Sequence, residues 1–400
     1  NTIRVPVTWG TMVKDDGSID AAWISRVEDV INYCIDEDMY VILNAHHDGA
    51  DNVGTDKEGK SVHGWLDIGG TDEEFAAVEA KYQKMWSSIA NYFKNYDEHL
   101  IFESMNEVYS GSGDKNLQQD MERINKLNKT FGAAVRSTGS NNAQRWLLLA
   151  SRNTNVKSLY KNADKFEIPN DGTDRYMVSV HDYDDFKIGG YTDSMNESKS
   201  DSYANQFKKL KAAFVDKGIP VVVGEWGFRG GADRTYKFEG VSYMLKKYGL
   251  VGCIWDNHGT QGTTDNYEIF DREQCAPYDK NYTDGVMRGF YTDSDDSQLN
   301  EKTTVSAMTS LDLDKDSVSI AVGSVEKVTA TTAPADNNDV VLWKSDNSRV
   351  ASVSNGRIHA RRIGTATITA YAQSGSVEKK ITVTVTKKTL EKETTDIQTD

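Results

Sequence analysis

The sequence predicts an α/β fold with a parallel sheet, followed by a small all-β domain. In the first 300 residues, short apolar runs alternate with longer amphipathic stretches, an order typical of strands and helices that build a parallel sheet. After about residue 305 the chain changes to short runs in which apolar and polar residues alternate. The charge changes at the same point, because residues 311–400 carry 12 basic and 12 acidic residues whereas the 400-residue chain has a net charge of −15.

The apolar runs of the first part predict seven strands, at Ile3–Val7, Tyr40–Ala45, Leu100–Met105, Trp146–Ala150, Tyr176–Val180, Ile219–Val223 and Leu250–Trp255. The amphipathic stretches predict helices at Ala21–Ile35, Glu73–Phe93, Leu117–Val135, Ser202–Val215 and Arg234–Lys247. Seven strands separated by helices suit a (β/α)8 TIM barrel that is one unit short. An open doubly wound sheet is the alternative, but no Gly-x-Gly-x-x-Gly turn follows any of these strands.

The later segment predicts a β-sandwich. Its alternating runs are Val318-Ile320-Val322, Ala366-Ile368-Ala370 and Ile381-Val383-Val385, and turn residues such as Gly323 and Asn355-Gly356 separate the runs. We therefore expect a barrel domain over residues 1–305, a sandwich over 306–388 and a polar tail or linker over 389–400.

Composition excludes several classes of protein. A net charge of −15 disfavours binding to nucleic acid or to an anionic membrane, and no run of about 18 apolar residues predicts a membrane span. Three cysteines are too few for a disulfide framework, and Cys34 and Cys253 lie in apolar patterns. The chain opens with Asn1 rather than Met, so the absence of a signal peptide says nothing about secretion.

Polar or aromatic side chains follow five of the predicted strands. Because the carboxyl ends of parallel strands meet at one mouth of a barrel, where active sites form, we expect these groups to lie together. They are His46-His47-Asp48, Asn106-Glu107, His181-Asp182-Tyr183, Glu225-Trp226 and Trp255-Asp256-Asn257.

Glu107 and Glu225 form the pair with the clearest chemistry. Two carboxylates on either side of a bond suit glycoside hydrolysis, in which one protonates the leaving oxygen and the other attacks the sugar carbon. The acid needs a raised pKa, through burial or a like charge. The nucleophile must stay ionised, which a cation such as Arg4 would favour.

A catalytic metal is the alternative, with His46, His47, Asp48, Glu107 and His181 as candidate ligands. Adjacent residues of a strand point to opposite faces, so His46 and His47 are poorly placed to share one ion. The chain contains no His-x-His, His-Glu-x-x-His or Gly-x-Ser-x-Gly motif. The sequence therefore predicts neither a metal nor another cofactor, and it disfavours Ser-His-Asp catalysis.

Six segments, in this order, resemble glycoside hydrolase family 5 over roughly residues 1–300. The segments are Ile3-Arg-Val-Pro-Val-Thr-Trp9, Leu43-Asn-Ala-His-His-Asp48, Phe102-Glu-Ser-Met-Asn-Glu107, Val180-His-Asp-Tyr183, Gly224-Glu-Trp-Gly227 and Ile254-Trp-Asp-Asn257. The resemblance implies a (β/α)8 barrel with retaining chemistry. It also implies that Glu107 is the general acid/base and that Glu225 is the nucleophile.

The resemblance implies further roles at matching positions. Asn106 would bind the sugar 2-hydroxyl, Arg4 and Tyr183 would orient the nucleophile, and His181 and His46 would line the same subsite. The remaining candidates for sugar binding are His47, Trp255 as the platform, Trp9 and Trp226 beside the motifs, and Trp65 in an outer subsite.

The sequences of these motifs look most like those of the endoglucanase and xyloglucanase branch of the family. Glu107 and Glu225 would end the fourth and seventh strands of the family's barrel, but they end the third and sixth predicted here. One βα unit is therefore missing, and an extra segment or a partner chain would have to complete the barrel. The segment Val341–Ala370 resembles a bacterial group 2 immunoglobulin-like domain.

From these observations we expect a secreted or cell-surface retaining endo-β-1,4-glucanase, without cofactor, that acts on a β-glucan polysaccharide. A xyloglucanase, mixed-linkage glucanase or mannanase remains an alternative with the same chemistry. A carbohydrate-binding or adhesion protein without turnover, and a metal-dependent barrel hydrolase, are alternatives of other classes.

Overall fold

A computed structural model describes residues 1–14, 16–49, 53–55, 61–111, 116–183, 196–198, 202–229, 234–257, 267–272, 275–278, 280–291, 306–335, 337, 339–354 and 356–387. The chain divides into two compact units, and each unit is described by itself. The predicted tail at 389–400 lies outside the described residues.

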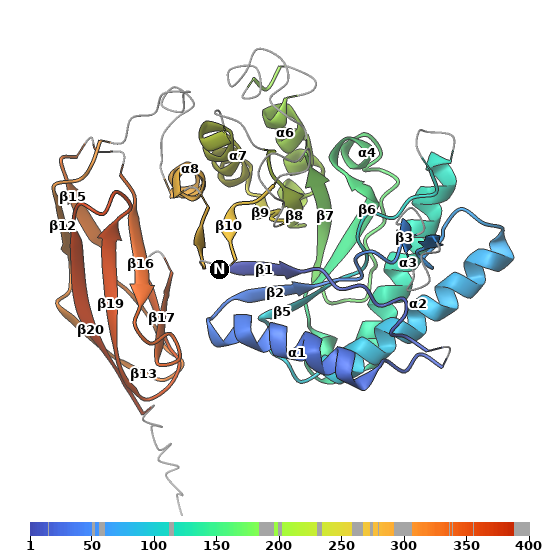
Figure 1. Cartoon of the computed structure of the whole chain (residues 1–400), viewed down its shortest axis with the longest axis horizontal. Helices are drawn as coiled ribbons and strands as arrows, with labels where there is room; N and C mark the ends of the chain where they lie inside the picture. Colours follow the sequence, from blue (N-terminus) through green and yellow to red (C-terminus); the bar gives the residue numbers. More distant parts are fainter. Residues whose placement is uncertain are drawn as a thin grey trace, which may run out of the picture. The chain divides into compact units, whose positions relative to one another are not determined.

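The first unit is built on a parallel sheet of seven strands in the order β1-β2-β5-β6-β7-β8-β9 (Figure 1). The strands are β1 (Thr2–Val5), β2 (Tyr40–Leu43), β5 (Leu100–Glu103), β6 (Leu147–Asn155), β7 (Tyr176–Asp182), β8 (Val221–Trp226) and β9 (Val251–Ile254). Every neighbouring pair is parallel. All seven predicted strands are confirmed, and the sheet is a nearly closed TIM-type barrel that lacks one unit.

Helices connect the strands and pack along the outside of the sheet (Figure 1). They are α1 (Ala21–Asp36), α2 (Asp72–Phe93), α3 (Leu117–Ser137), α4 (Val156–Lys161), α6 (Tyr203–Ala213), α7 (Arg234–Tyr248) and α8 (Lys280–Tyr291), with short 3-10 turns η1 (Ser140–Ala143) and η2 (Val215–Lys217). Small hairpins are formed by β3 (Val53–Thr55) with β4 (Ser61–His63) and by β10 (Phe270–Asp271) with β11 (Ala276–Pro277). The sequence analysis predicted five of the helices but not α4 or α8.

Local sequence explains where α2 begins and which face it buries. Thr71 is the N-cap, and it forms a capping box in which its hydroxyl accepts from Glu74 N while the Glu74 carboxylate accepts from Thr71 N. Phe75, Tyr82 and Trp86 recur at helical spacing and are buried against the sheet. The cap and the apolar stripe together define this helix.

Side chains alternate along the strands between the helices and the barrel interior. In β2, Val41 and Leu43 pack in the large core beneath the helices, whereas Ile42 belongs to a small inner cluster with Leu148 and Val222. This is the alternation expected of a closed sheet whose interior is filled by side chains. The inner apolar cluster fills the barrel interior. Inward-facing polar residues lie nearer the carboxyl ends of the strands.

The edges of the sheet are β1 and β9, the two strands that would flank the missing one. Among the described residues, neither edge pairs with a further strand. Val251 in β9 is 50% exposed and Ile3 in β1 is 38% exposed, which is unusual for apolar residues of a barrel strand. The structure thus confirms the predicted absence of one βα unit.

The second unit is all β, as the alternating pattern predicts. Its strands are β12 (Ser310–Leu313), β13 (Ser317–Ala321), β14 (Val325–Lys327), β15 (Ala330–Ala333), β16 (Val341–Ser345), β17 (Ala351–Ser354), β18 (Arg357–Ala360), β19 (Gly364–Ala372) and β20 (Glu378–Thr386). They form sheets in the orders β13-β20-β19-β16, β14-β18-β17 and β12-β15. Val318, Ile358, Ile368 and Val383 are buried between the strands as a separate hydrophobic core.

Within the described part of the chain, no helix combines the length and the apolar character needed to span a bilayer.

Candidate active site

Six strands bring the predicted site residues to the carboxyl mouth of the barrel. Arg4 lies in β1, His181 in β7 and Glu225 in β8, while the other site residues follow the ends of their strands. Backbone hydrogen bonds hold the strand extensions in place, including His46 N to Val7 O at 2.8 Å and Asn106 N to Ala45 O at 2.9 Å. The sheet therefore brings residues that are far apart in the sequence together in one site.

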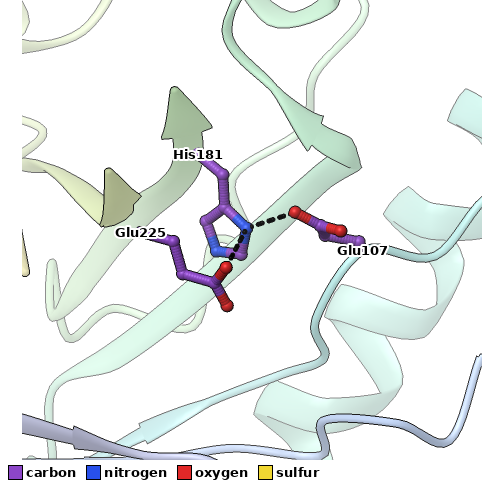
Figure 2. Close-up of side chains that lie close together, drawn as sticks. All are labelled: Glu107, His181 and Glu225. Atoms are coloured by element: carbon purple, nitrogen blue, oxygen red, sulfur yellow. Dashed lines mark hydrogen bonds and ion pairs between the residues drawn. The ribbon is translucent and has the colours of Figure 1, made fainter. Parts of the chain in front are cut away.

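The two predicted catalytic carboxylates lie on either side of His181 (Figure 2). A Glu107 oxygen, a Glu225 oxygen and a His181 ring nitrogen all lie within 4.8 Å of one another. Retaining glycosidases place their carboxyl groups about 5–5.5 Å apart, whereas inverting enzymes need about 6.5–9.5 Å to admit a water. The separation of the two carboxylates fits the retaining arrangement.

Arg4 connects three groups of the site. Its Nε donates to Glu103 Oε2 at 2.6 Å, Nη1 to Glu225 Oε1 at 2.7 Å and Nη2 to Asn106 Oδ1 at 2.9 Å. Burial lowers the pKa of Arg4, but the negative charges of Glu103 and Glu225 outweigh burial and raise it above its ordinary value. Arg4 is thus a permanent cation against Glu225, as the sequence analysis expected.

Glu103 supplies a negative charge that pairs with the buried Arg4 guanidinium. It is fully buried, and it accepts one hydrogen bond from Arg4 and another from Ser179 Oγ at 2.6 Å. A buried charge is costly unless it is paired and hydrogen-bonded, and both conditions are met here. Glu103 therefore fixes the direction in which the Arg4 guanidinium points.

Tyr183 provides a second donor to Glu225, with its hydroxyl 2.7 Å from Oε2. Burial and the negative charge of Glu225 raise the pKa of Tyr183 well above its ordinary value, so the phenol keeps its proton. Glu225 consequently accepts from a cation and from a neutral hydroxyl, one on each carboxylate oxygen. Glu225 is thus held through both carboxylate oxygens, which fixes its orientation.

Glu107 is held differently. His181 Nδ1 lies 2.7 Å from Glu107 Oε1, and the Glu107 side chain is 36% exposed. Burial raises the pKa of Glu107, but the hydrogen bond and charge of His181, together with Arg4, outweigh burial and lower it. The expectation of a raised pKa is therefore wrong for the free site, because His181 stabilises the carboxylate.

His46 enters the site as a neutral ring. Burial, then the charge of Arg4, lowers the pKa of His46 to about 2. Asn44 Nδ2 lies 3.1 Å from His46 Nδ1, and Asn44 Oδ1 accepts from Val7 N, which sets the direction of the amide. Nδ1 is thus the acceptor and Nε2 carries the proton, 3.9 Å from Glu225 Oε1.

Trp255 stacks on His46, with ring centroids 5.7 Å apart and an angle of 10° between the planes. Its backbone N–H donates to Trp226 O at 2.9 Å, which holds the indole at the mouth of the barrel. His47 contacts His46 edge to face and is exposed, whereas His46 is buried, as their adjacent positions predict. The half-buried indole of Trp255 is suited to a sugar platform.

Two of the predicted subsite aromatics lie in the protein core. Trp9 is fully buried, and its Nε1 donates to Asn44 O at 2.8 Å. Trp226 is 2% exposed and packs against Phe228 and Phe238. The prediction that Trp9 and Trp226 line sugar subsites is wrong, because both rings are buried in the hydrophobic core.

Trp65 is half-buried beside the site, and its Nε1 donates to Asp48 Oδ1 at 2.8 Å. Burial raises the pKa of Asp48, although hydrogen bonds from Trp9 N and Trp65 Nε1 act in the opposite direction. Asp48 thus orients Trp65. The candidate outer subsite therefore rests on Trp65, and the backbone N–H of Trp9 helps to hold Asp48 in place.

Glu107, His181 and Glu225 have the number and spacing of donor atoms that a metal ion could use. A divalent ion there would lie beside Arg4, whose Nη1 already occupies Glu225 Oε1 at 2.7 Å. Cation repulsion makes the donor set a poor fit for a resident metal.

Burial raises the pKa of Cys253 to about 11, so this thiol beneath the site stays protonated and is not a nucleophile.

Sequence reasoning assigned no role to Glu103, Asn44 or Ser179, although each holds a site residue in place. One signal was available, since Glu103 is a charged residue inside the apolar run Leu100–Met105. A charge in such a run indicates a buried partner.

Paired carboxylates at the carboxyl edge of a parallel barrel, one of them held by a cation and a phenol, are the arrangement expected of a glycoside hydrolase. Residues 1–261 match the model of the cellulase family, glycosyl hydrolase family 5, and the chain belongs to that family. Residues 307–385 match the bacterial Ig-like domain of group 2.

Curated relatives and solved structures agree with this assignment. The chain is 34% identical to Endoglucanase 1 of Ruminococcus albus, over 70% of this chain and 66% of that protein. It is 33% identical to Endoglucanase B of Ruminococcus albus, over 74% of this chain and 69% of that protein. A family 5 xyloglucanase from Paenibacillus pabuli is similar in structure, with a TM-score of 0.62 and 31% identity over 72% of this chain and 86% of the other.

Proposed function

We propose that the barrel unit is a retaining endo-β-1,4-glucanase that hydrolyses internal bonds of cellulose-type β-glucans. The observation that carries the proposal is the asymmetry of the carboxylate pair. Glu225 accepts from Arg4 and Tyr183, while Glu107 is bonded to His181 and is partly exposed. One carboxylate is thus held in a fixed orientation by two donors, and the other is open to exchange a proton.

In the first step, Glu225 attacks the anomeric carbon and Glu107 gives its proton to the leaving oxygen. Glu107 must therefore gain a proton before this step, although His181 lowers its pKa in the free site. A bound sugar chain covers the mouth and removes water, and burial already acts to raise the pKa of Glu107. Substrate binding thus prepares the acid.

In the second step, Glu107 accepts a proton from a water that attacks the glycosyl-enzyme intermediate, which regenerates Glu225 with retained configuration. Asn106 accepts from Arg4 through Oδ1, so its Nδ2 is directed to the substrate and would donate to the sugar 2-hydroxyl. His46 Nε2–H would donate to the same sugar, while Trp255 covers its apolar face. The chain's own residues supply every proton transfer of this scheme.

Cellulose-type β-glucan is the substrate we propose, and related glucans are the alternatives. The relatives and similar structures include endoglucanases, a xyloglucanase and a lichenase. Xyloglucan and mixed-linkage glucan share a β-glucan backbone with cellulose, so they remain the alternative substrates, and mannan is the more distant one. A polymer of this size cannot enter a cell, so we also propose that the enzyme acts outside the cell or at its surface.

We further propose that another segment, or a partner chain, supplies a strand between β1 and β9. Both edges are parallel strands with exposed apolar side chains, Ile3 and Val251, which a parallel strand would cover. This addition would close the sheet beside Arg4, and it would therefore stiffen the site.

Release of reducing sugar from carboxymethylcellulose, xyloglucan, mixed-linkage glucan and mannan tests the proposed function. We expect release from the glucans, and its loss in the Glu225→Ala variant. Release from none of the polymers, together with measurable binding of oligosaccharides, would instead indicate a carbohydrate-binding protein.

A further inference from the structure

The chain beyond β5 contains one residue more than a regular strand would have. Within the sheet, Leu43 of β2 pairs in register with Phe102 of β5. At this register a parallel ladder would join Met105 N to Ala45 O. Asn106 N makes that bond instead, at 2.9 Å. The strand therefore carries a β-bulge at residues 104–105.

The bulge determines which side chains face the mouth of the barrel. Side chains alternate along a strand, and Glu103 faces inward to Arg4. Strict alternation from Glu103 would turn Met105 inward and Asn106 outward. Met105 is instead buried in the core beneath the helices, and Asn106 Oδ1 accepts from Arg4 Nη2 at 2.9 Å. The extra residue thus brings Asn106 into the site, with Glu107 next to it.

Ser104 connects the bulge to β6 in an unusual way. Its backbone N–H donates to Leu148 O at 2.9 Å, as a regular ladder requires. The next ladder bond would run from Ala150 N to Ser104 O. Ala150 N donates to Ser104 Oγ instead, at 3.0 Å. The hydroxyl thus takes the place of the carbonyl in the ladder, and the carbonyl is free to bond elsewhere.

Two side chains of α2 bind this carbonyl. The Tyr82 hydroxyl donates to Ser104 O at 2.7 Å, and Trp86 Nε1 donates to the same oxygen at 3.1 Å. Both rings are fully buried, and Trp86 packs edge to face on Phe131 with ring centroids 4.6 Å apart. Burial raises the pKa of Tyr82 well above its ordinary value, so the phenol keeps the proton that it donates. Two donors use both lone pairs of the carbonyl and fix the peptide at Ser104.

Glu107 depends on this backbone more than Asn106 does. Asn106 is also held by its backbone bond to the end of β2 and by Arg4. The Glu107 side chain is 36% exposed and is bonded to His181 from another strand. A shift of the peptide at Ser104 would therefore displace mainly Glu107.

We propose that Ser104, Tyr82 and Trp86 are positioning residues of the active site, which hold Glu107 where it can protonate the leaving oxygen. All three are fully buried, so they act through the backbone rather than on the substrate. The inference rests on the proposed function. Loss of one of their hydrogen bonds should slow the proton transfer from Glu107 and leave the attack by Glu225 intact.

The test uses two variants that each delete a single oxygen atom, Tyr82→Phe and Ser104→Ala. The matched controls are Tyr176→Phe, at the start of β7, and Ser242→Ala, in α7, which also delete buried, hydrogen-bonded hydroxyls. The substrates are cellohexaose and 2,4-dinitrophenyl β-cellobioside, whose leaving group needs no proton. For both substrates kcat/KM reports the first step, and denaturation curves verify that each variant is folded in the assay.

We expect kcat/KM for cellohexaose to fall about tenfold in Tyr82→Phe and in Ser104→Ala, while kcat/KM for the aryl glycoside changes less than about twofold. The controls should match the wild type on both substrates. Equal losses on the two substrates, or an unchanged kcat/KM for cellohexaose in both variants, would overturn the positioning role alone. A wild-type enzyme that is inert on both substrates would overturn the proposed function, and the positioning role with it.

Discussion

Arg4 Nη1 lies 2.7 Å from Glu225 Oε1, and this contact joins β1, at one edge of the sheet, to β8 near the other. The same guanidinium reaches Glu103 and Asn106. A single buried cation thus positions the proposed nucleophile and a residue that would bind the attacked sugar. The arrangement of the site depends on how firmly Arg4 is held.

Glu103→Gln tests the support of Arg4. The change keeps a hydrogen-bonding side chain but removes the charge that balances the guanidinium from below. Since Arg4 can then shift, we expect kcat to fall about tenfold or more while KM changes less than about threefold. Ser179→Ala, which removes only one hydrogen bond to Glu103, is the control and should have a smaller effect. Steady-state kinetics with wild-type kcat in Glu103→Gln would contradict the role of Glu103.

Substrates with different leaving groups distinguish the role of Glu107 from that of Glu225. We expect Glu107→Gln to lower polymer hydrolysis about 10²- to 10⁴-fold, since general acid catalysis is lost. A 2,4-dinitrophenyl glycoside needs no protonation to leave, so its first-step burst should survive in Glu107→Gln. Glu225→Gln should abolish turnover of both substrates. Equal sensitivity of the two substrates to Glu107→Gln would show that Glu107 is not the acid.

His181 lowers the pKa of Glu107, so its removal should raise that pKa. The protonated form of Glu107 would then persist to higher pH, and the alkaline limb of kcat/KM should move to higher pH in His181→Phe. The pH profile with an oligosaccharide substrate measures this shift. His99→Phe is the control, because His99 bonds to Asp97 beside β5, away from the site. A limb that stays in place or moves to lower pH in His181→Phe would refute the assignment.

Replacing Trp255 should affect substrate binding, whereas replacing Trp9 should affect the stability of the fold. Trp255→Ala removes the platform, and we expect KM to rise about five- to tenfold with little loss of thermal stability. Trp9→Ala leaves a cavity in the core and should cost about 3–5 kcal/mol of unfolding free energy. Denaturation curves and KM values for both variants decide the matter. A rise in KM without loss of stability in Trp9→Ala would indicate that Trp9 binds the sugar.

Chelation should leave the activity unchanged. Arg4 lies against the carboxylate that a metal would need, and the proposed steps use only Glu107, Glu225 and water. Dialysis against EDTA, followed by assay with and without added Mg²⁺, Ca²⁺ or Zn²⁺, measures the requirement. Lost activity that one of these ions restores would favour the metal-dependent alternative.

Periodicity and strand-end chemistry were sufficient to predict most of the barrel. Apolar runs marked all seven strands, and the residues after them were brought to one mouth because parallel strands share a direction. The helix α4 was missed because it has only six residues, whereas the amphipathic pattern of α8 was present in the sequence and was overlooked. The missing βα unit was recognised from the offset of the two glutamates rather than from any local pattern.

The sequence was a weaker guide to the surroundings of each side chain. Trp226 follows Glu225 in β8, and the alternation of the strand turns its ring toward the core. Trp9 lies beyond the end of β1 and is fully buried as well. The lowered pKa of Glu107 depends on a contact with His181 from another strand, which no local motif reports. Likewise, Asn44 and Ser179 act through neighbours that only the folded sheet provides.

The stereochemical course of hydrolysis tests the central claim most directly, because it depends on both carboxylates at once. Proton NMR of cellohexaose during the first minutes of the reaction shows which anomer is released before mutarotation. Since a Glu107 oxygen and a Glu225 oxygen lie within 4.8 Å of each other, we predict that the β-anomer appears first and the α-anomer only later. Initial release of the α-anomer would mean inversion, and it would contradict Glu225 as a covalent nucleophile.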